Sequence, residues 1–362
     1  MKYTINKQKG SAPAYLQLYS SIRQDIIDEV YKFNSKLPSK RTIAEELNIS
    51  TITVEHAYSL LQDEGYIEAK ERSGYFVCFT KQDNYLKVSP QIIKTKSTPV
   101  HTKTNLEFPF SVLAKIMRQV LSIYGQDILT KSDNMGLPLL KEAIKDYLYR
   151  ARGIETSYQQ IIIGAGSEYL YGLIIELLSR DKTYAIESPS YKKIEEVYKA
   201  AKVNFIRLPL SNDGISSEHL KKASADVLHV SPYRSFPSGV SASASKRHEY
   251  LRWAQNNKYI IEDDFESEFS VSKKSEETLF SHTTCDNVIY MNTFSKTISP
   301  SIRVGYMVIP KHLVKVFKEN LGFYSCTVPT VMQIVIATLI NNGDFERHIN
   351  RTRRKKRKEL QK

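Results

Sequence analysis

The sequence contains little cysteine and no long apolar run. Three cysteines, Cys78, Cys285 and Cys326, lie far apart among 362 residues, so we expect neither a disulfide framework nor a cysteine metal site. The eight histidines form no paired ligand motif, and no metal is expected. No window approaches a transmembrane span, and the polar N-terminus MKYTINKQKG lacks the apolar core of a signal peptide. We therefore expect a cytoplasmic protein with no membrane partner.

The net charge of +13 is concentrated in two segments. Residues 1–80 carry ten basic and ten acidic side chains, whereas residues 81–104 carry five lysines and one aspartate. Residues 347–362 carry nine basic side chains and one acidic side chain. A prediction of DNA binding by the first eighty residues must therefore rest on motifs and not on the overall charge.

The first eighty residues predict three helices followed by a hairpin. Apolar residues recur at helical spacing in 14–30, and Ser39 is a suitable N-cap for a short helix over 40–47. A third helix is expected over 51–64, ended by Gly65, before two strands at 66–69 and 75–77. This order is typical of a winged helix-turn-helix, whose second paired helix enters the major groove.

The motifs LPSKRTIA at 37–44, EGY at 64–66 and GYFV at 74–77 resemble the GntR group of bacterial regulators. The resemblance implies contacts with double-stranded promoter DNA, with a wing tip between the strands. Thr51 replaces an arginine usual in that group, and the charge is balanced, so we expect dimerisation to supply part of the affinity. A packing or dimerisation module is the alternative. The implied DNA-binding residues are Arg41, Thr51, Thr53, His56, Tyr58, Arg72, Ser73 and Gly74.

Residues 81–106 are rich in Lys, Thr, Ser, Gln and Pro and show no periodicity. Such a composition cannot bury enough apolar surface to fold, so we expect a flexible tether. A DNA-binding tail is the alternative interpretation of its lysines.

From residue 107 to residue 362, helices alternate with short apolar strands, which predicts an α/β domain with a mostly parallel central sheet. Its most informative segment is 293–306, TFSKTISPSIRVGY, which follows the apolar run at 288–291. Lys296 would lie just past the end of a strand. Thr293, Ser295 and Arg303 could donate charge-assisted hydrogen bonds to a phosphate. A lysine in a dry pocket beside such donors suits a Schiff base with pyridoxal phosphate, and a surface lysine at a strand exit is the alternative.

Three other strand ends agree with this interpretation. A glycine turn at 164–166 precedes Ser167 at a helix start, where free amides can bind phosphate. Tyr191 follows the strand at 183–186, where its ring could stack on a pyridine. Three carboxylates end the strand at 260–264. Asp263 is the favoured partner of a pyridine nitrogen, whereas Glu262 and Asp264 are expected to be solvated.

These elements, in this order, resemble fold-type I pyridoxal-phosphate enzymes of the aminotransferase class over residues 107–362. Together with the GntR-like head, the chain resembles MocR/GabR-type transcriptional regulators. The resemblance implies a homodimer in which Lys296 forms the Schiff base and Asp263 holds the pyridine nitrogen. It also implies that Tyr191 stacks on the ring. The implied phosphate ligands are Ser167, Thr293, Ser295 and Arg303.

Two features depart from the family pattern. Phe236 and Phe265 replace the asparagine and tyrosine expected to support the cofactor's phenolic oxygen, which argues against efficient transamination. The chain stops at Lys362, within a basic run, where related proteins continue into a small domain with a carboxylate-binding arginine. We therefore expect that domain to be incomplete. An exposed helix leading into it is favoured over a nucleic-acid-binding tail.

The sequence thus predicts a regulator in which an amino compound exchanges with Lys296, forming an external aldimine that alters DNA binding. Transaminase activity is expected to be weak at most. One alternative is an active aminotransferase with an appended DNA-binding domain. Another is a DNA-binding protein whose shortened large domain no longer holds pyridoxal phosphate.

Overall fold

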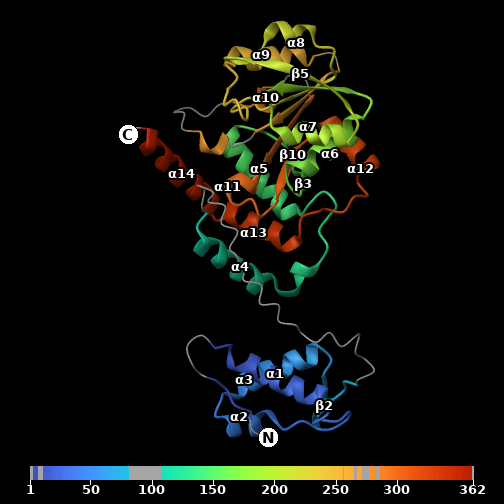
Figure 1. The fold of residues 1–362 in the computed structure, drawn as a ribbon, viewed down its shortest axis with the longest axis vertical. Helices are drawn as coiled ribbons and strands as arrows, with labels where there is room; N and C mark the ends of the chain where they lie inside the picture. The colour runs from blue at the N-terminus through green and yellow to red at the C-terminus, as the bar shows by residue number, and fades with distance from the viewer. Residues whose placement is uncertain are drawn as a thin grey trace. The chain divides into compact units, whose positions relative to one another are not determined.

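The computed structural model describes residues 3–6, 11–80, 108–255, 257–264, 267–270, 277–282 and 286–360. The chain divides into two compact units, Met1–Val100 and His101–Lys362, each with its own hydrophobic core (Figure 1). The tether predicted over residues 81–106 lies outside the described residues. In the part of the chain that is described, no helix is both long and apolar enough to cross a membrane.

The first unit is a three-helix domain closed by a hairpin, as predicted. The apolar stripe of α1 (Ala14–Ile27) packs on α3 (Thr51–Asp63). The short helix α2 (Lys40–Leu47) begins at the predicted cap, where Ser39 Oγ accepts a hydrogen bond from the Thr42 amide over 3.1 Å. Strands β1 (Ile67–Lys70) and β2 (Gly74–Val77) pair antiparallel. Strand β2 begins at Gly74, whose φ of 106° glycine adopts without steric cost.

The second unit is built on an eight-stranded sheet in the order β3-β10-β9-β8-β7-β4-β5-β6. The five strands from β9 to β5 run parallel, whereas β10 is antiparallel to both of its neighbours. The sheet is thus largely parallel, as predicted. Its strands are β3 (Ile161–Gly164), β4 (Thr183–Ser188), β5 (Asn204–Ser211), β6 (Gly214–Ile215), β7 (Val227–Val230), β8 (Tyr259–Asp263), β9 (Val288–Thr293) and β10 (Gly305–Val308).

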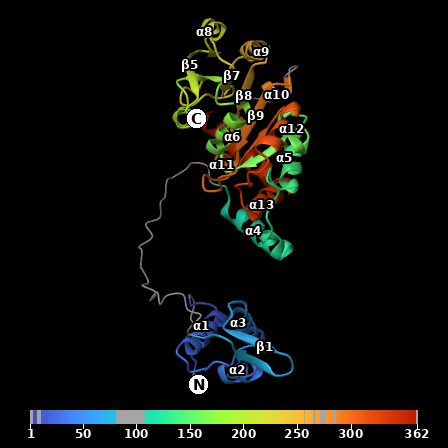
Figure 2. The same ribbon diagram turned by 90° about the vertical axis from the view of Figure 1, so that its right-hand side faces the viewer.

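Helices cover both faces of this sheet, because successive side chains of a strand point to opposite faces. Ile161 and Ile163 pack with α5 and α13, whereas Ile162 packs with α6 and α12. Figure 2 shows α5 and α6 on opposite sides of the strands. The helices are α4 (Phe110–Tyr124), α5 (Pro138–Arg152), α6 (Ser167–Leu178), α7 (Lys192–Ala200), α8 (Ser217–Lys222), α9 (Ala244–Trp253), α10 (Leu279–His282), α11 (Phe294–Thr297), α12 (Lys311–Asn320), α13 (Thr330–Asn341) and α14 (Asp344–Leu360).

Candidate functional site

The polar residues predicted for the site lie at one edge of the sheet. Strands β4, β7, β8 and β9 are parallel, so their carboxyl ends meet at the same edge. Strand β3 ends there too, because Gly305 of β10 pairs with Thr293 on one side and with Gly164 on the other. The ends of parallel strands are where ligands bind in open α/β sheets. Asp263, Thr293 and the turn before α6 are therefore brought to a common edge.

The turn between β3 and α6 is built for close approach. Gly166 has a φ of 92°, and a Cβ there would lie 2.7 Å from Nη2 of Arg303. Only glycine therefore allows the guanidinium to lie against the start of α6. The free amides of that helix and the neighbouring arginine form a cationic region suited to a phosphate group.

Three predicted residues lie where β9 turns into the short helix α11. Thr293 Oγ1 accepts a hydrogen bond from the Ser295 amide over 3.2 Å and so caps α11. The Ser295 hydroxyl oxygen is buried, and no described group bonds to it. A buried hydroxyl with no partner fits a site that receives an oxygen-rich ligand. Lys296, the next residue, is exposed.

Arg303 is engaged by a carboxylate that the sequence analysis did not single out. Its Nη2 lies 2.5 Å from Oε2 of Glu168, the second residue of α6. The other oxygen, Oε1, accepts a hydrogen bond from Lys193 Nζ over 2.7 Å. Burial alone would raise the pKa of Glu168, but hydrogen bonds from Lys193 and Arg303 outweigh it and lower the pKa to about 2.

Asp263 is buried beside Tyr171 and His229. The Tyr171 hydroxyl donates to its Oδ2 over 2.5 Å, and His229 Nε2 lies 3.8 Å from the same oxygen. Tyr198 fixes the other side of that imidazole, with 2.7 Å between its hydroxyl and Nδ1. Burial, and next the charge of Asp263, keep the pKa of Tyr171 well above its usual value, so the phenol remains a donor.

Ser167, one helical turn earlier in α6, acts against burial and lowers the pKa of the Tyr171 phenol. The predicted phosphate ligand and the phenol that bonds the predicted pyridine partner thus lie on the same helix. Two signals in the sequence could have found this network. Tyr171 follows Ser167 at a spacing of four, and His229 is a lone polar residue in the apolar strand β7.

Tyr191 lies immediately before α7 and packs edge-on against Phe236, with 5.9 Å between the ring centroids. Phe236, on the loop after β7, is about half exposed. The second predicted replacement, Phe265, lies outside the described residues. The two described aromatic rings thus lie together in loops that follow β4 and β7.

The prediction that Glu262 and Asp264 are solvated is wrong, because both side chains are fully buried. Glu262 accepts hydrogen bonds from the Tyr233 hydroxyl and from the amides of Leu279 and Phe280 at the start of α10. Asp264 pairs with Arg152, which reaches it from the end of α5. The pKa of each of Glu187, Glu262 and Glu268 is raised to about 7, mainly because the carboxylate is buried.

In the first unit, most of the predicted DNA contacts are accessible. Arg41, Thr51 and His56 are exposed, and Thr53 is partly so. Tyr58, which the resemblance implies as a DNA contact, is not accessible. Its side chain is fully buried, its hydroxyl donates to the Pro38 carbonyl over 2.7 Å, and its ring meets Tyr75 edge-on. In the predicted wing tip, Arg72 and Ser73 lie in the exposed turn between β1 and β2, and Gly74 begins β2 and is also exposed.

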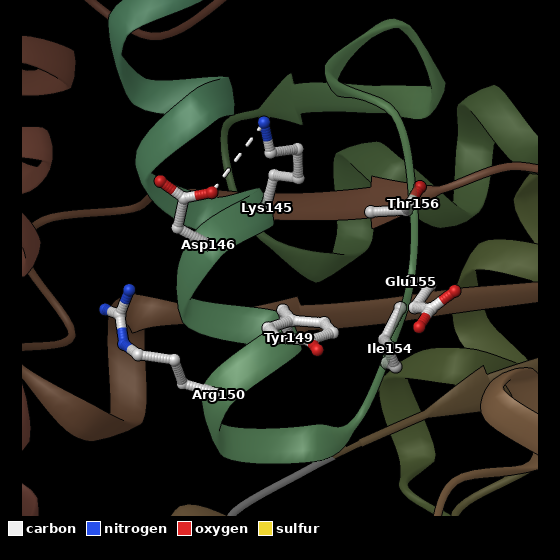
Figure 3. A pocket seen from close by; sticks show the side chains of 7 residues that line it. All are labelled: Lys145, Asp146, Tyr149, Arg150, Ile154, Glu155 and Thr156. Atoms are coloured by element: carbon white, nitrogen blue, oxygen red, sulfur yellow. Dashed lines mark ion pairs between the residues drawn. The ribbon is translucent and has the colours of Figure 1, made fainter.

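A pocket of about 320 Å³ lies at the carboxyl end of α5, but none of the predicted site residues lines it (Figure 3). Charged side chains line it, and Nζ of Lys145 lies 3.7 Å from Oδ1 of Asp146. Within the described ranges, no group of three or more His, Cys, Asp or Glu side chains is arranged for a metal ion. The sheet edge therefore remains the candidate site.

Comparisons with known proteins agree with the two-unit architecture. Residues 14–77 match the family of bacterial regulatory proteins called gntR, and residues 104–362 match aminotransferase class I and II. The Pyrococcus horikoshii kynurenine aminotransferase has a similar fold, with a TM-score of 0.63 and 24% identity. That match covers 68% of this chain and 64% of the enzyme.

Full-length similarity is found among bacterial regulators. The chain is 32% identical to the HTH-type transcriptional regulator YdeL of Bacillus subtilis, over 96% of this chain and 77% of YdeL. It is 27% identical to the probable rhizopine catabolism regulatory protein MocR of Rhizobium meliloti, over 95% of this chain and 75% of MocR. Identity to the pyridoxine biosynthesis regulator PdxR of Corynebacterium glutamicum is 26%, over 93% and 75% of the two chains. The chain therefore belongs to the MocR-type helix-turn-helix transcriptional regulators, in which a gntR-family DNA-binding domain precedes an aminotransferase class I and II domain.

Proposed function

We propose that this regulator senses an amino compound through pyridoxal phosphate held at Lys296, and that the ligand alters its binding to promoter DNA. The observation that carries the proposal is the meeting of Lys296, Asp263 and the start of α6 at one sheet edge. Residues 1–80 would bind DNA, residues 81–106 would connect the domains, and residues 107–362 would hold the cofactor. A protein that binds bacterial chromosomal DNA acts in the cytoplasm.

The donor set at this edge fits the cofactor. Ser167, Ser295 and Arg303 offer two hydroxyls and a guanidinium for the phosphate, and Thr293 holds the Ser295 amide in place. Asp263 is buried and oriented by Tyr171, as a partner of a protonated ring nitrogen must be. Tyr191 would stack on the ring. When bound, pyridoxal phosphate supplies an aldehyde that condenses reversibly with amines, at which the effector competes with Lys296.

The same proposal includes a homodimer. Helix α4 exposes Phe110, Met117 and Leu121 along one face, although Ile116 and Val120 on an adjacent face pack into the core. An apolar face of this kind on a folded domain indicates a protein contact. A second copy would cover it and bring two DNA-binding domains to one operator, whose half-sites mirror the protein's symmetry.

The test compares the visible absorbance of the purified protein mixed with pyridoxal phosphate with that of Lys296→Ala. The wild type should show a visible band. Borohydride reduction should then attach the cofactor covalently to Lys296, as peptide mass spectrometry can verify. Lys311→Ala, an exposed lysine on α12, is the matched control and should behave as wild type. Equal bands in Lys296→Ala and wild type would contradict the assignment of Lys296.

A second measurement connects the cofactor to DNA. Candidate amines that shift the absorbance band should also change the affinity for a promoter fragment, and the DNA should change the affinity for the amine by the same factor. Sustained turnover of an amino donor and a keto acid would instead favour an active aminotransferase. Unchanged DNA affinity in the presence of every amine that shifts the band would contradict sensing.

A further inference from the structure

The phosphate seat is the proposed phosphate-binding site formed by Ser167, Ser295 and Arg303. Glu168 places a negative charge at this site, where a phosphate group would bring its own negative charge. It is the second residue of α6, and its two oxygens bond Arg303 and Lys193 over 2.5 and 2.7 Å. A carboxylate in the first turn of a helix is favoured by the helix dipole, and here two cations add to that field. Glu168 therefore balances, within the chain, the positive charge that a phosphate dianion would otherwise balance.

Glu168 occupies Nη2 of the Arg303 guanidinium, so a phosphate would share the cation with it. Gly166 packs against one side of the guanidinium, and Glu168 holds the same Nη2 that a Cβ at Gly166 would approach. A phosphate bound at the start of α6 would bring a second negative charge close to Glu168. Because like charges repel at short range, the phosphate and Glu168 would compete for Arg303.

We propose that Glu168 is a specificity-determining residue of the phosphate seat, which holds Arg303 in the ligand-free protein and yields it to a phosphorylated ligand. Lys193 keeps the released carboxylate, because Lys193 Nζ bonds Oε1 of Glu168 whereas Arg303 bonds Oε2. This inference rests on the proposed function, since it concerns the same seat. It deepens that function by setting how tightly the phosphate group, as distinct from the pyridine ring, is bound.

Lys193, which bonds Glu168, also lies close in sequence to Tyr191, the proposed stacking residue. Lys193 lies in the first turn of α7, two residues after Tyr191. A carboxylate that moves from Arg303 towards Lys193 changes the charge on the turn that presents Tyr191. Occupation of the phosphate seat is thereby coupled to the helix that bears the stacking ring.

The test is Glu168→Gln, which removes the charge and keeps the shape. Its affinity for pyridoxal phosphate should rise by about two- to five-fold, the range expected for a partly exposed ion pair. Its affinity for pyridoxal, which lacks the phosphate, should not change. Glu176→Gln is the matched control, because Glu176 lies on the same helix and pairs with Arg180 away from the seat. That variant should bind both compounds as the wild type does.

A double-mutant cycle with Lys193→Met tests the second half of the proposal. Without Lys193, Glu168 is held by Arg303 alone, so Lys193→Met should weaken binding of pyridoxal phosphate. In the Glu168→Gln background the same change should have little effect. Equal effects in both backgrounds would show that Lys193 acts on the ligand directly and would overturn its role as the carboxylate's second holder.

The outcomes for this inference and for the proposed function are distinct. If the wild type binds pyridoxal phosphate and Glu168→Gln binds it no more tightly, the inference is overturned while the cofactor site stands. An equal gain for pyridoxal and pyridoxal phosphate also overturns it, because the effect would not depend on the phosphate. If neither protein takes up pyridoxal phosphate, the proposed function fails and the inference fails with it.

Discussion

Arg152 and Asp264 form a buried ion pair between residues that are far apart in the sequence. Arg152 Nη2 lies 3.0 Å from Asp264 Oδ2, and the two side chains are 9% and 0% exposed. The Tyr290 hydroxyl donates to the same Oδ2 over 2.5 Å, and the ring of Tyr233 lies 4.6 Å from the guanidinium carbon. The pair joins the end of α5 to the residue that follows Asp263. It therefore holds the strand end on which the proposed pyridine partner is placed.

Replacing this arginine should destabilise the second unit strongly. Arg152→Met leaves Asp264 buried without its countercharge, and we expect a loss of about 3–5 kcal/mol in the free energy of unfolding. Urea denaturation followed by circular dichroism measures this loss. Arg150→Met is the control, because Arg150 pairs with Glu346 at the surface and its loss should cost at most about 1 kcal/mol. Similar losses for the two variants would show that Asp264 does not depend on Arg152.

The buried carboxylate of Glu268 should make stability depend on pH. Burial, followed by the charge of Asp264, raises its pKa to about 7. The folded state therefore binds this proton more tightly than the unfolded state. The contribution to stability is complete below the unfolded pKa and is lost as the pH rises through about 7.

Glu268→Gln removes this titration. Relative to wild type, its free energy of unfolding should be higher by about 2 kcal/mol near pH 8 and little changed near pH 5. Urea denaturation at the two pH values provides the comparison, with Glu319→Gln as an exposed carboxylate control. A difference that does not depend on pH would show that Glu268 acts through packing and not through its charge.

The phenol of Tyr171 should matter for both stability and cofactor binding. Tyr171→Phe leaves buried Asp263 with one donor fewer, which should cost about 1–3 kcal/mol in the free energy of unfolding. It should also weaken uptake of pyridoxal phosphate, because the Asp263 carboxylate loses the hydroxyl that orients it. Tyr184→Phe removes a hydroxyl that bonds the Ser179 carbonyl and should leave cofactor uptake unchanged. Equal cofactor affinity in Tyr171→Phe and wild type would limit Tyr171 to a structural role.

Elements of the fold could be predicted from the sequence where the signals that set their bounds are local. The helix over 40–47 was predicted at its observed bounds, because the N-cap Ser39 and the apolar spacing both act within a few residues. Tyr58 was misplaced although helical periodicity could have placed it. It lies four residues after Val54 and three before Leu61, so it falls on the same buried face.

Burial of the carboxylates could not be read from local pattern. Glu262 and Asp264 end a strand, where polar residues are usually solvated, and their burial depends on partners from distant elements. Arg152 reaches Asp264 from α5, and Tyr233 reaches Glu262 from the loop after β7. Glu168 was overlooked for the same reason, because its cations come from α7 and from the segment before β10. Long-range charge pairing leaves no periodic signal in a single sequence.

Arg41 provides a test of the DNA-binding surface. It is exposed on the first turn of α2, so its guanidinium is free to reach a phosphate oxygen of the DNA backbone. Arg41→Ala should weaken binding to promoter fragments and unrelated fragments alike, and it should reduce the slope of log affinity against log salt by about 1. Titration of labelled DNA at several salt concentrations measures that slope. Lys32→Ala, an exposed cation outside α2, α3 and the wing, is the control and should leave the slope unchanged. If Arg41→Ala instead weakened binding only to promoter fragments, Arg41 would be reading base edges and not the backbone.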